Sequence, residues 1–192
     1  DFEFHMAYPN VKKFPSELCE IVESFGCKLY PMRHNMANVL RSQVTRYAEE
    51  KRWQVLPVAF ESEWYYNHMK KRIEDTIKKS GIKFDNLVVS SGSGVTCTAL
   101  ADGFFGMGGK NMYTICVSSE KTVGRKTQVL GKDENITVIK SGFAFDDFMT
   151  QLDVPFPCNQ FWDRKAWHWL QEHIKTLKGK TLFWNLGGLW DF

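Results

Sequence analysis

Short apolar runs alternate with longer segments of helical periodicity along this chain, and that alternation limits its fold more than any other feature. Residues 87–89 and 112–117 are mostly apolar runs of the kind that form buried strands. Residues 63–80 instead repeat apolar side chains every three or four positions, as one face of a helix does. The pattern predicts a three-layer α/β fold, in which a mostly parallel, twisted sheet carries helices on both faces.

The same two patterns place the remaining elements. Helices are expected at 15–25, 35–51, 63–80 (ended by Gly81), 95–105, 121–130 and 163–177. Strands are expected at 27–31, 53–57, 87–89, 112–117, 136–139 and 181–184. Residues 141–162 form one long irregular connection, a kind of segment that often carries binding residues.

Composition excludes several classes of protein. The chain has 192 residues, of which 43% are hydrophobic and 24% charged, so it can build a globular core. The net charge of +3 gives no argument by itself for a nucleic-acid or membrane surface. No apolar run approaches the roughly 20 residues of a membrane helix. The five cysteines are odd in number and lack a C-x-x-C pair, so we expect reduced thiols, a cytoplasmic location and no metal site.

The first six residues are interpreted as a cloning remnant. Glu-Phe and His-Met are dipeptides that common cloning sites encode, and residues 1–6 contain both. We therefore expect the native sequence to begin at Met6, and the expected elements leave these first residues out.

The loop that follows the strand at 87–89 carries the clearest chemical signal. Residues 90–96 read Ser-Ser-Gly-Ser-Gly-Val-Thr and lead into a helix. Free N–H groups and the helix dipole favour an anion at such a helix start, while glycines let a phosphate approach the backbone. The alternative is a tight turn with serine capping. No Gly-Lys-Ser/Thr follows, and the glycine spacing differs from that of a dinucleotide fingerprint.

Three segments, residues 87–100, 161–166 and 181–188, carry a resemblance to a known family. In the same order, they resemble segments of fold-type II pyridoxal-phosphate enzymes, and in particular of the aminocyclopropane-carboxylate deaminase and D-cysteine desulfhydrase group. Residues 87–100 resemble that group's phosphate-binding segment with its Gly-Ser-Gly-x-Thr loop. Residues 161–166 resemble its Tyr-Thr-Gly-Lys-Ala stretch, and 181–188 its closing strand plus Thr-Gly-Gly. The resemblance covers about residues 50–190 and extends faintly over 8–50.

The resemblance implies a tryptophan synthase beta-like fold that is incomplete at the N-terminus. Residues 7–57 would be a remnant of the small domain and 58–192 the large cofactor-binding domain. The implied cofactor is pyridoxal 5'-phosphate, whose phosphate would be held by Ser91, Gly92, Ser93, Gly94, Val95 and Thr96.

Four more positions follow from the resemblance. Leu186 stands where the family often offers a hydroxyl to the pyridine nitrogen, and Asn185 is the nearest polar substitute. Trp162 stands where the family has a late tyrosine. Lys165 matches the family's late lysine at a helix start, and an ordinary surface lysine is an equally good interpretation of this residue. Trp162 and Lys165 are therefore the catalytic candidates. The Schiff-base lysine, which the family carries near its N-terminus, is not found in this chain.

The expected function is a pyridoxal-phosphate-dependent enzyme, or a fragment of one, of the lyase or deaminase type. Its substrate would be a small amino acid or amine, and we expect a homodimer with a missing N-terminal segment or a partner chain. A first alternative is a catalytically silent partner or regulatory domain. A second is modification of an amine carried on a nucleobase, which the basic run 70–72 and the late tryptophans permit.

Overall fold

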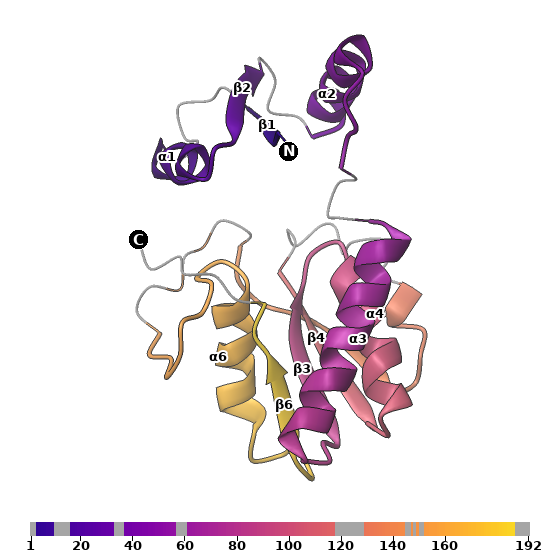
Figure 1. Cartoon of the computed structure of the whole chain (residues 1–192). Helices are drawn as coiled ribbons and strands as arrows, with labels where there is room; N and C mark the ends of the chain where they lie inside the picture. Colours follow the sequence, from indigo (N-terminus) through magenta and orange to yellow (C-terminus); the bar gives the residue numbers. More distant parts are fainter. Residues whose placement is uncertain are drawn as a thin grey trace. The chain divides into compact units, whose positions relative to one another are not determined.

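The chain divides into two compact units, Asp1–Leu56 and Pro57–Phe192. In this computed structural model, residues 3–9, 16–32, 37–56, 61–117, 129–144, 147, 149 and 152–186 are described. Most of the helix expected at 121–130 lies outside the described residues, as do Pro57 and the closing Gly187-Gly188. Figure 1 shows the elements of each unit.

The described residues of the first unit form two parallel strands and two helices. β1 (His5–Pro9) pairs with β2 (Lys28–Met32), so that His5 lies opposite Lys28. The helices are α1 (Ser16–Ser24) and α2 (Ala37–Lys51). His5 and Met6, which the sequence-based expectations left out of the fold, belong to β1. The dipeptide signal concerned the origin of these residues and carried no information about their pairing.

The prediction of a strand at 53–57 is wrong for its described part, residues 53–56, which are not part of a strand. The Trp53 N–H donates to the Ala48 carbonyl at 2.8 Å and so continues the end of α2. The Trp53 ring stacks on His5, with centroids 3.8 Å apart. An aromatic side chain that packs on β1 produced the strand-like composition of this segment.

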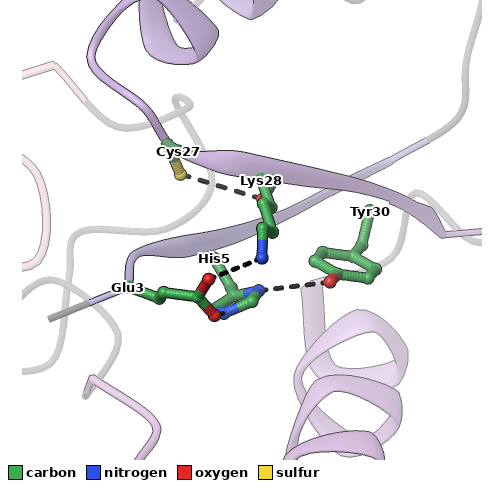
Figure 2. Close-up of polar contacts among 5 residues, drawn as sticks. All are labelled: Glu3, His5, Cys27, Lys28 and Tyr30. Atoms are coloured by element: carbon green, nitrogen blue, oxygen red, sulfur yellow. Dashed lines mark hydrogen bonds and ion pairs between the residues drawn. The ribbon is translucent and has the colours of Figure 1, made fainter.

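Side-chain contacts across β1 and β2 support their register (Figure 2). Lys28 Nζ donates to Glu3 Oε1 at 2.6 Å, and His5 Nδ1 lies 3.2 Å from the Tyr30 hydroxyl. The hydrogen bond from Lys28 holds the pKa of the Glu3 carboxyl below its usual value. The Cys27 thiol lies 3.8 Å from the Lys28 carbonyl oxygen.

The described residues of the second unit form a four-stranded parallel sheet with helices on both faces, as the sequence predicts. Its strands run in the order β5-β4-β3-β6, and β3 pairs in parallel with both β4 and β6. The elements in chain order are α3 (Glu63–Ser80), β3 (Asn86–Ser91), α4 (Val95–Gly106), β4 (Asn111–Cys116), β5 (Ile136–Lys140), α6 (Asp163–His173) and β6 (Thr181–Trp184).

Alternate residues of β3 build two separate cores. Leu87 and Val89 pack on the side of α3 and α4, whereas Val88 packs on the side of α6. Figure 1 shows these two helical layers flanking the sheet. The helix expected at 163–177 is shorter in the structure: α6 ends at His173, and Ile174 directly after it is 44% exposed.

Helices α3 and α4 approach each other closely at Gly103. A Cβ atom at this position would lie 2.5 Å from Ile73 Cγ2 and 2.7 Å from the Lys70 carbonyl oxygen. Ser62 caps the start of α3, where its Oγ accepts from the Tyr65 N–H at 3.2 Å, and Gly81 caps the end with φ 65°. The contact at Gly103 fixes the separation of the two helices that border the site.

Candidate functional site

A pocket of about 260 Å³ lies where β3 ends and α4 begins. This is the edge of a parallel sheet at which α/β proteins usually bind ligands. Its described lining residues are Tyr65, Ser90, Ser91, Gly92, Ser93, Gly94, Thr96, Cys97, Asn159, Trp162, Asp163 and Leu186. Five of the six residues predicted to hold a phosphate are among them. The sixth, Val95, is 5% exposed and packs into the fold.

The loop between β3 and α4 has the geometry of an anion cradle. Gly94 is the N-cap of α4 and adopts φ 88°, a left-handed conformation that glycine reaches without strain. The Ser93 hydroxyl lies 3.4 Å from the Val95 N–H. The N–H groups of the first helical turn have no partner within the helix and point toward the loop. A phosphate placed there meets these donors, the positive end of the helix dipole and the hydroxyls of the loop.

Trp162 forms a wall of the pocket. A Cβ atom at Gly92 would lie 2.6 Å from Trp162 Cζ3, so the ring rests directly on the loop backbone and requires glycine there. The other late tryptophans pack in the two cores: Trp184 is buried, Trp167 contacts Phe183 edge-on, and Trp169 lies against Tyr113. Of these four tryptophans, Trp162 lines this pocket.

A buried carboxyl group supports the loop from below. The Ser90 hydroxyl donates to Asp163 Oδ1 at 2.6 Å, and Asp163 has no exposed surface. This hydrogen bond joins the end of β3 to the first residue of α6. The sequence analysis missed Asp163 as a pocket residue. An acidic residue in the first helical turn is a common feature, so its sequence signal could not be distinguished from ordinary helix stabilisation.

Lys165 is completely buried, and the surface reading of this residue is therefore wrong. Its Nζ donates to the Ala144 carbonyl at 2.6 Å. The neighbouring Arg164 donates to the Met149 carbonyl at 3.0 Å and to the Cys158 carbonyl at 3.3 Å. The start of α6 therefore anchors the described parts of the long connection. Lys165 is absent from the described lining of the pocket.

Two contacts fix the other side of the pocket. The Tyr65 hydroxyl lies 2.9 Å from Thr96 Oγ1 and joins α3 to the start of α4. The Cys97 thiol donates to the Ser90 carbonyl at 3.4 Å. Burial raises the pKa of Cys97 to about 12, so this thiol stays protonated at neutral pH and is unsuited to act as a nucleophile. Sequence periodicity did not indicate Tyr65 or Cys97 as pocket residues, because both belong to ordinary helical stretches.

Asn185 and Leu186 follow β6 and take different positions. Leu186 lines the pocket, but Asn185 lines a second pocket beside it. The Asn185 side-chain amide donates to the Pro157 carbonyl at 2.6 Å. The second pocket shares Tyr65 and Leu186 with the first.

The other sequence expectations concern metals and membranes. Among the described residues, His, Cys, Asp and Glu side chains do not gather into groups of three or more that could hold a metal. Within the same residues, all helices are too short or too polar to cross a membrane.

Comparison with solved structures identifies the fold. An ACC deaminase homologue superposes with a TM-score of 0.78 at 16% identity, covering 97% of this chain and 66% of that one. A hydrogen sulfide-producing enzyme from Fusobacterium nucleatum gives 0.68 at 11% identity, covering 94% and 68%. The chain has the fold of fold-type II pyridoxal-phosphate enzymes. Diaminopropionate ammonia lyase from Escherichia coli shares it, with a TM-score of 0.65 at 8% identity, covering 98% of this chain and 60% of that one.

A curated protein is similar in sequence. The glycyl-dTMP PLP-dependent decarboxylase of Pseudomonas phage M6 is 30% identical over 112 residues. The match covers 53% of this chain and 40% of that protein, so the chain spans less than half the length of this relative. No family model matches the sequence.

Proposed function

We propose that the chain binds pyridoxal 5'-phosphate at the pocket above β3 and belongs to an enzyme of the lyase, deaminase or decarboxylase type. The observation that carries this proposal is the loop of residues 91–96, which opens α4 at the carboxyl edge of a parallel sheet. The fold and the phage decarboxylase match point to the same cofactor.

The residues at the pocket fit the cofactor's phosphate. Ser91, Ser93 and Thr96 carry hydroxyl groups, and the left-handed Gly94 turns the first N–H groups of α4 toward the loop. Trp162 supplies an aromatic wall for a flat ring. When bound, the cofactor acts as an electron sink for bonds that break at an amino acid's α-carbon. The chain's own residues hold the phosphate, exclude water with Trp162 and Leu186, and keep the loop rigid through Ser90 and Asp163.

The pocket departs from the family at two places. Leu186 has no hydroxyl to offer a pyridine nitrogen, and the described lining residues include no lysine. We propose that the attachment lysine comes from a segment or partner chain outside this described lining, with residues 7–57 acting as a small domain and two copies forming a dimer. The same departures favour the second candidate, a domain that binds the cofactor but is catalytically silent.

The substrate class is proposed from the phage relative. Its name describes decarboxylation of a glycyl group on a thymidine nucleotide. We propose that this chain serves a related reaction on an amino acid group carried by a nucleotide. The bond between the α-carbon and the carboxyl carbon breaks, carbon dioxide leaves, and a proton replaces it. A free amino acid is the alternative substrate, which the ammonia lyase and deaminase likenesses support.

Cofactor binding is tested by titrating the full chain with pyridoxal 5'-phosphate while tryptophan emission and visible absorbance are recorded. We expect saturable quenching that unphosphorylated pyridoxal does not reproduce. Gly94→Asp should abolish it, because the new carboxylate lies at the helix start where the phosphate binds. Gly108→Asp is the matched control: it lies beyond the other end of α4, has φ 83° and has open space for a Cβ.

Equal binding by Gly94→Asp and the unaltered chain would refute the proposed site. Activity is measured separately as carbon dioxide release from glycyl-dTMP. Cofactor binding without release of carbon dioxide, even when a lysine-bearing partner segment is supplied, would favour the silent domain over the enzyme.

A further inference from the structure

A second pocket of about 330 Å³ adjoins the cofactor pocket, and the function proposed above leaves it without a role. Its described lining includes Trp64, Tyr65, His68, Arg72 and Leu186. Tyr65 and Leu186 line both pockets, so a ligand that extends past these two side chains would occupy both spaces.

Three of the lining residues form a column along α3. Trp64, His68 and Arg72 are spaced four residues apart, which places their side chains on one side of the helix. The Trp64 and His68 rings are stacked, with centroids 5.5 Å apart and planes 15° apart. Trp64 is 70% exposed, an unusual position for so large an apolar side chain. The column therefore offers exposed aromatic surface beside the cofactor pocket.

The far end of the column is cationic. In the part of the chain that the structure describes, no hydrogen bond or salt bridge involves the Arg72 guanidinium. No carboxylate is among the described lining residues. Arg72 lies eight residues from Trp64, about 12 Å along the helix axis. Flat rings at one end and a guanidinium at the other match a nucleobase and a phosphate, respectively.

We propose that this second pocket is the subsite for the thymidine nucleotide that carries the amino acid group. The base stacks at Trp64 and His68, the phosphate pairs with Arg72, and the amino acid group passes Tyr65 and Leu186 into the cofactor pocket. The proposal rests on the proposed function and assigns its specificity to side chains that lie apart from the phosphate loop. The nucleotide is either free or a unit of a DNA strand, because both present the same base and phosphate.

The test measures binding of dTMP to the full chain by calorimetry, with Trp64→Ala, Arg72→Gln and Lys71→Gln compared. Lys71 is the matched control, because it is exposed on the same helix turn but does not line the pocket. We expect the dissociation constant to rise about tenfold or more for Trp64→Ala and for Arg72→Gln and to stay unchanged for Lys71→Gln. Thymidine, which lacks the phosphate, should bind more weakly and be insensitive to Arg72→Gln. Both altered side chains are exposed, so thermal unfolding should show that the variants remain folded.

Two further arms separate the possible failures. In Gly94→Asp, dTMP binding should persist although cofactor binding is lost, so failure of the cofactor site leaves this subsite testable. Tighter binding of oligothymidylate than of dTMP supports the subsite within a DNA strand, and the reverse supports a free nucleotide. Absence of dTMP binding in a chain that binds the cofactor would overturn the inference. An equal loss of affinity in Lys71→Gln would overturn it as well, because binding would then depend on general charge.

Discussion

Replacement of Gly103 by alanine should destabilise the second unit, although alanine normally stabilises a helix. The intrinsic gain of glycine to alanine is about 0.5–1 kcal/mol. At Gly103 the new Cβ would lie 2.5 Å from Ile73 Cγ2 and 2.7 Å from the Lys70 carbonyl oxygen. The backbone oxygen can move only with α3 itself, and overpacking of this kind costs about 1–3 kcal/mol. The expected net effect is a loss of about 1–2 kcal/mol.

Gly106 in the same helix provides the control. No atom lies within 4 Å of a Cβ built there, and its φ is not positive. Gly106→Ala should therefore leave the free energy of unfolding unchanged or raise it by about 0.5 kcal/mol. The two variants are compared by urea unfolding followed by tryptophan fluorescence and circular dichroism. Each kcal/mol corresponds to about 2–4 °C in Tm for a chain of this size.

Stabilisation of both variants by the same amount would refute the close helix contact. A second readout follows from the position of Tyr65 on α3. In Gly103→Ala, a shift of α3 away from α4 should lengthen the 2.9 Å contact between the Tyr65 hydroxyl and Thr96 Oγ1 and so weaken cofactor binding. Gly106→Ala should leave cofactor binding unchanged.

Two further predictions concern groups around the sheet. Ser90→Ala should lower the free energy of unfolding, measured by urea unfolding, by about 1–3 kcal/mol, because the buried Asp163 carboxyl loses its hydroxyl donor. The control Ser93→Ala, at an exposed position, should change this free energy by less than about 0.5 kcal/mol. Equal effects of the two substitutions would contradict the Ser90–Asp163 contact. The hydrogen bond from Lys110 lowers the pKa of the Asp85 carboxyl, so its stabilising contribution should be complete above roughly pH 4 and be lost as the pH falls through the lowered pKa. As the pH falls from neutral to acidic, the urea midpoint of Asp85→Asn should therefore decline less than that of the unaltered chain. An equally steep decline in both proteins would contradict the stabilising role of the Asp85 carboxylate.

The parts of the fold that periodicity controls could be predicted from the sequence. One strand corresponds to the buried run around Leu87, and one helix to the spacing of Met69, Ile73 and Ile77. The three-layer fold with its parallel sheet follows from the alternation of such strands and helices. Predictions failed where a side chain in tertiary contact decides the local structure. Trp53 has strand-like neighbours, but its backbone continues the end of α2 and its ring stacks on His5.

The candidate site divides in the same way. The glycine and serine loop was visible because the residues that turn a strand into a helix are contiguous in sequence. Asp163 and Tyr65 were not visible, because they reach the pocket only when α6 and α3 pack against the sheet. The burial of Lys165 was likewise unpredictable, since its partner is a backbone carbonyl 21 positions away.

The pairing of β3 with β6 has a consequence for the synthesis of this protein. Residue 86 pairs with residue 181, so β3 acquires β6 as its second neighbouring strand only after the residues between the two strands have been synthesised. All six residues of β3 are buried in the finished fold. Until β6 leaves the ribosome, β3 has an open edge at which another nascent chain can pair. The pocket at the loop of residues 91–96 can therefore be complete only after Leu186, which follows β6, has been synthesised.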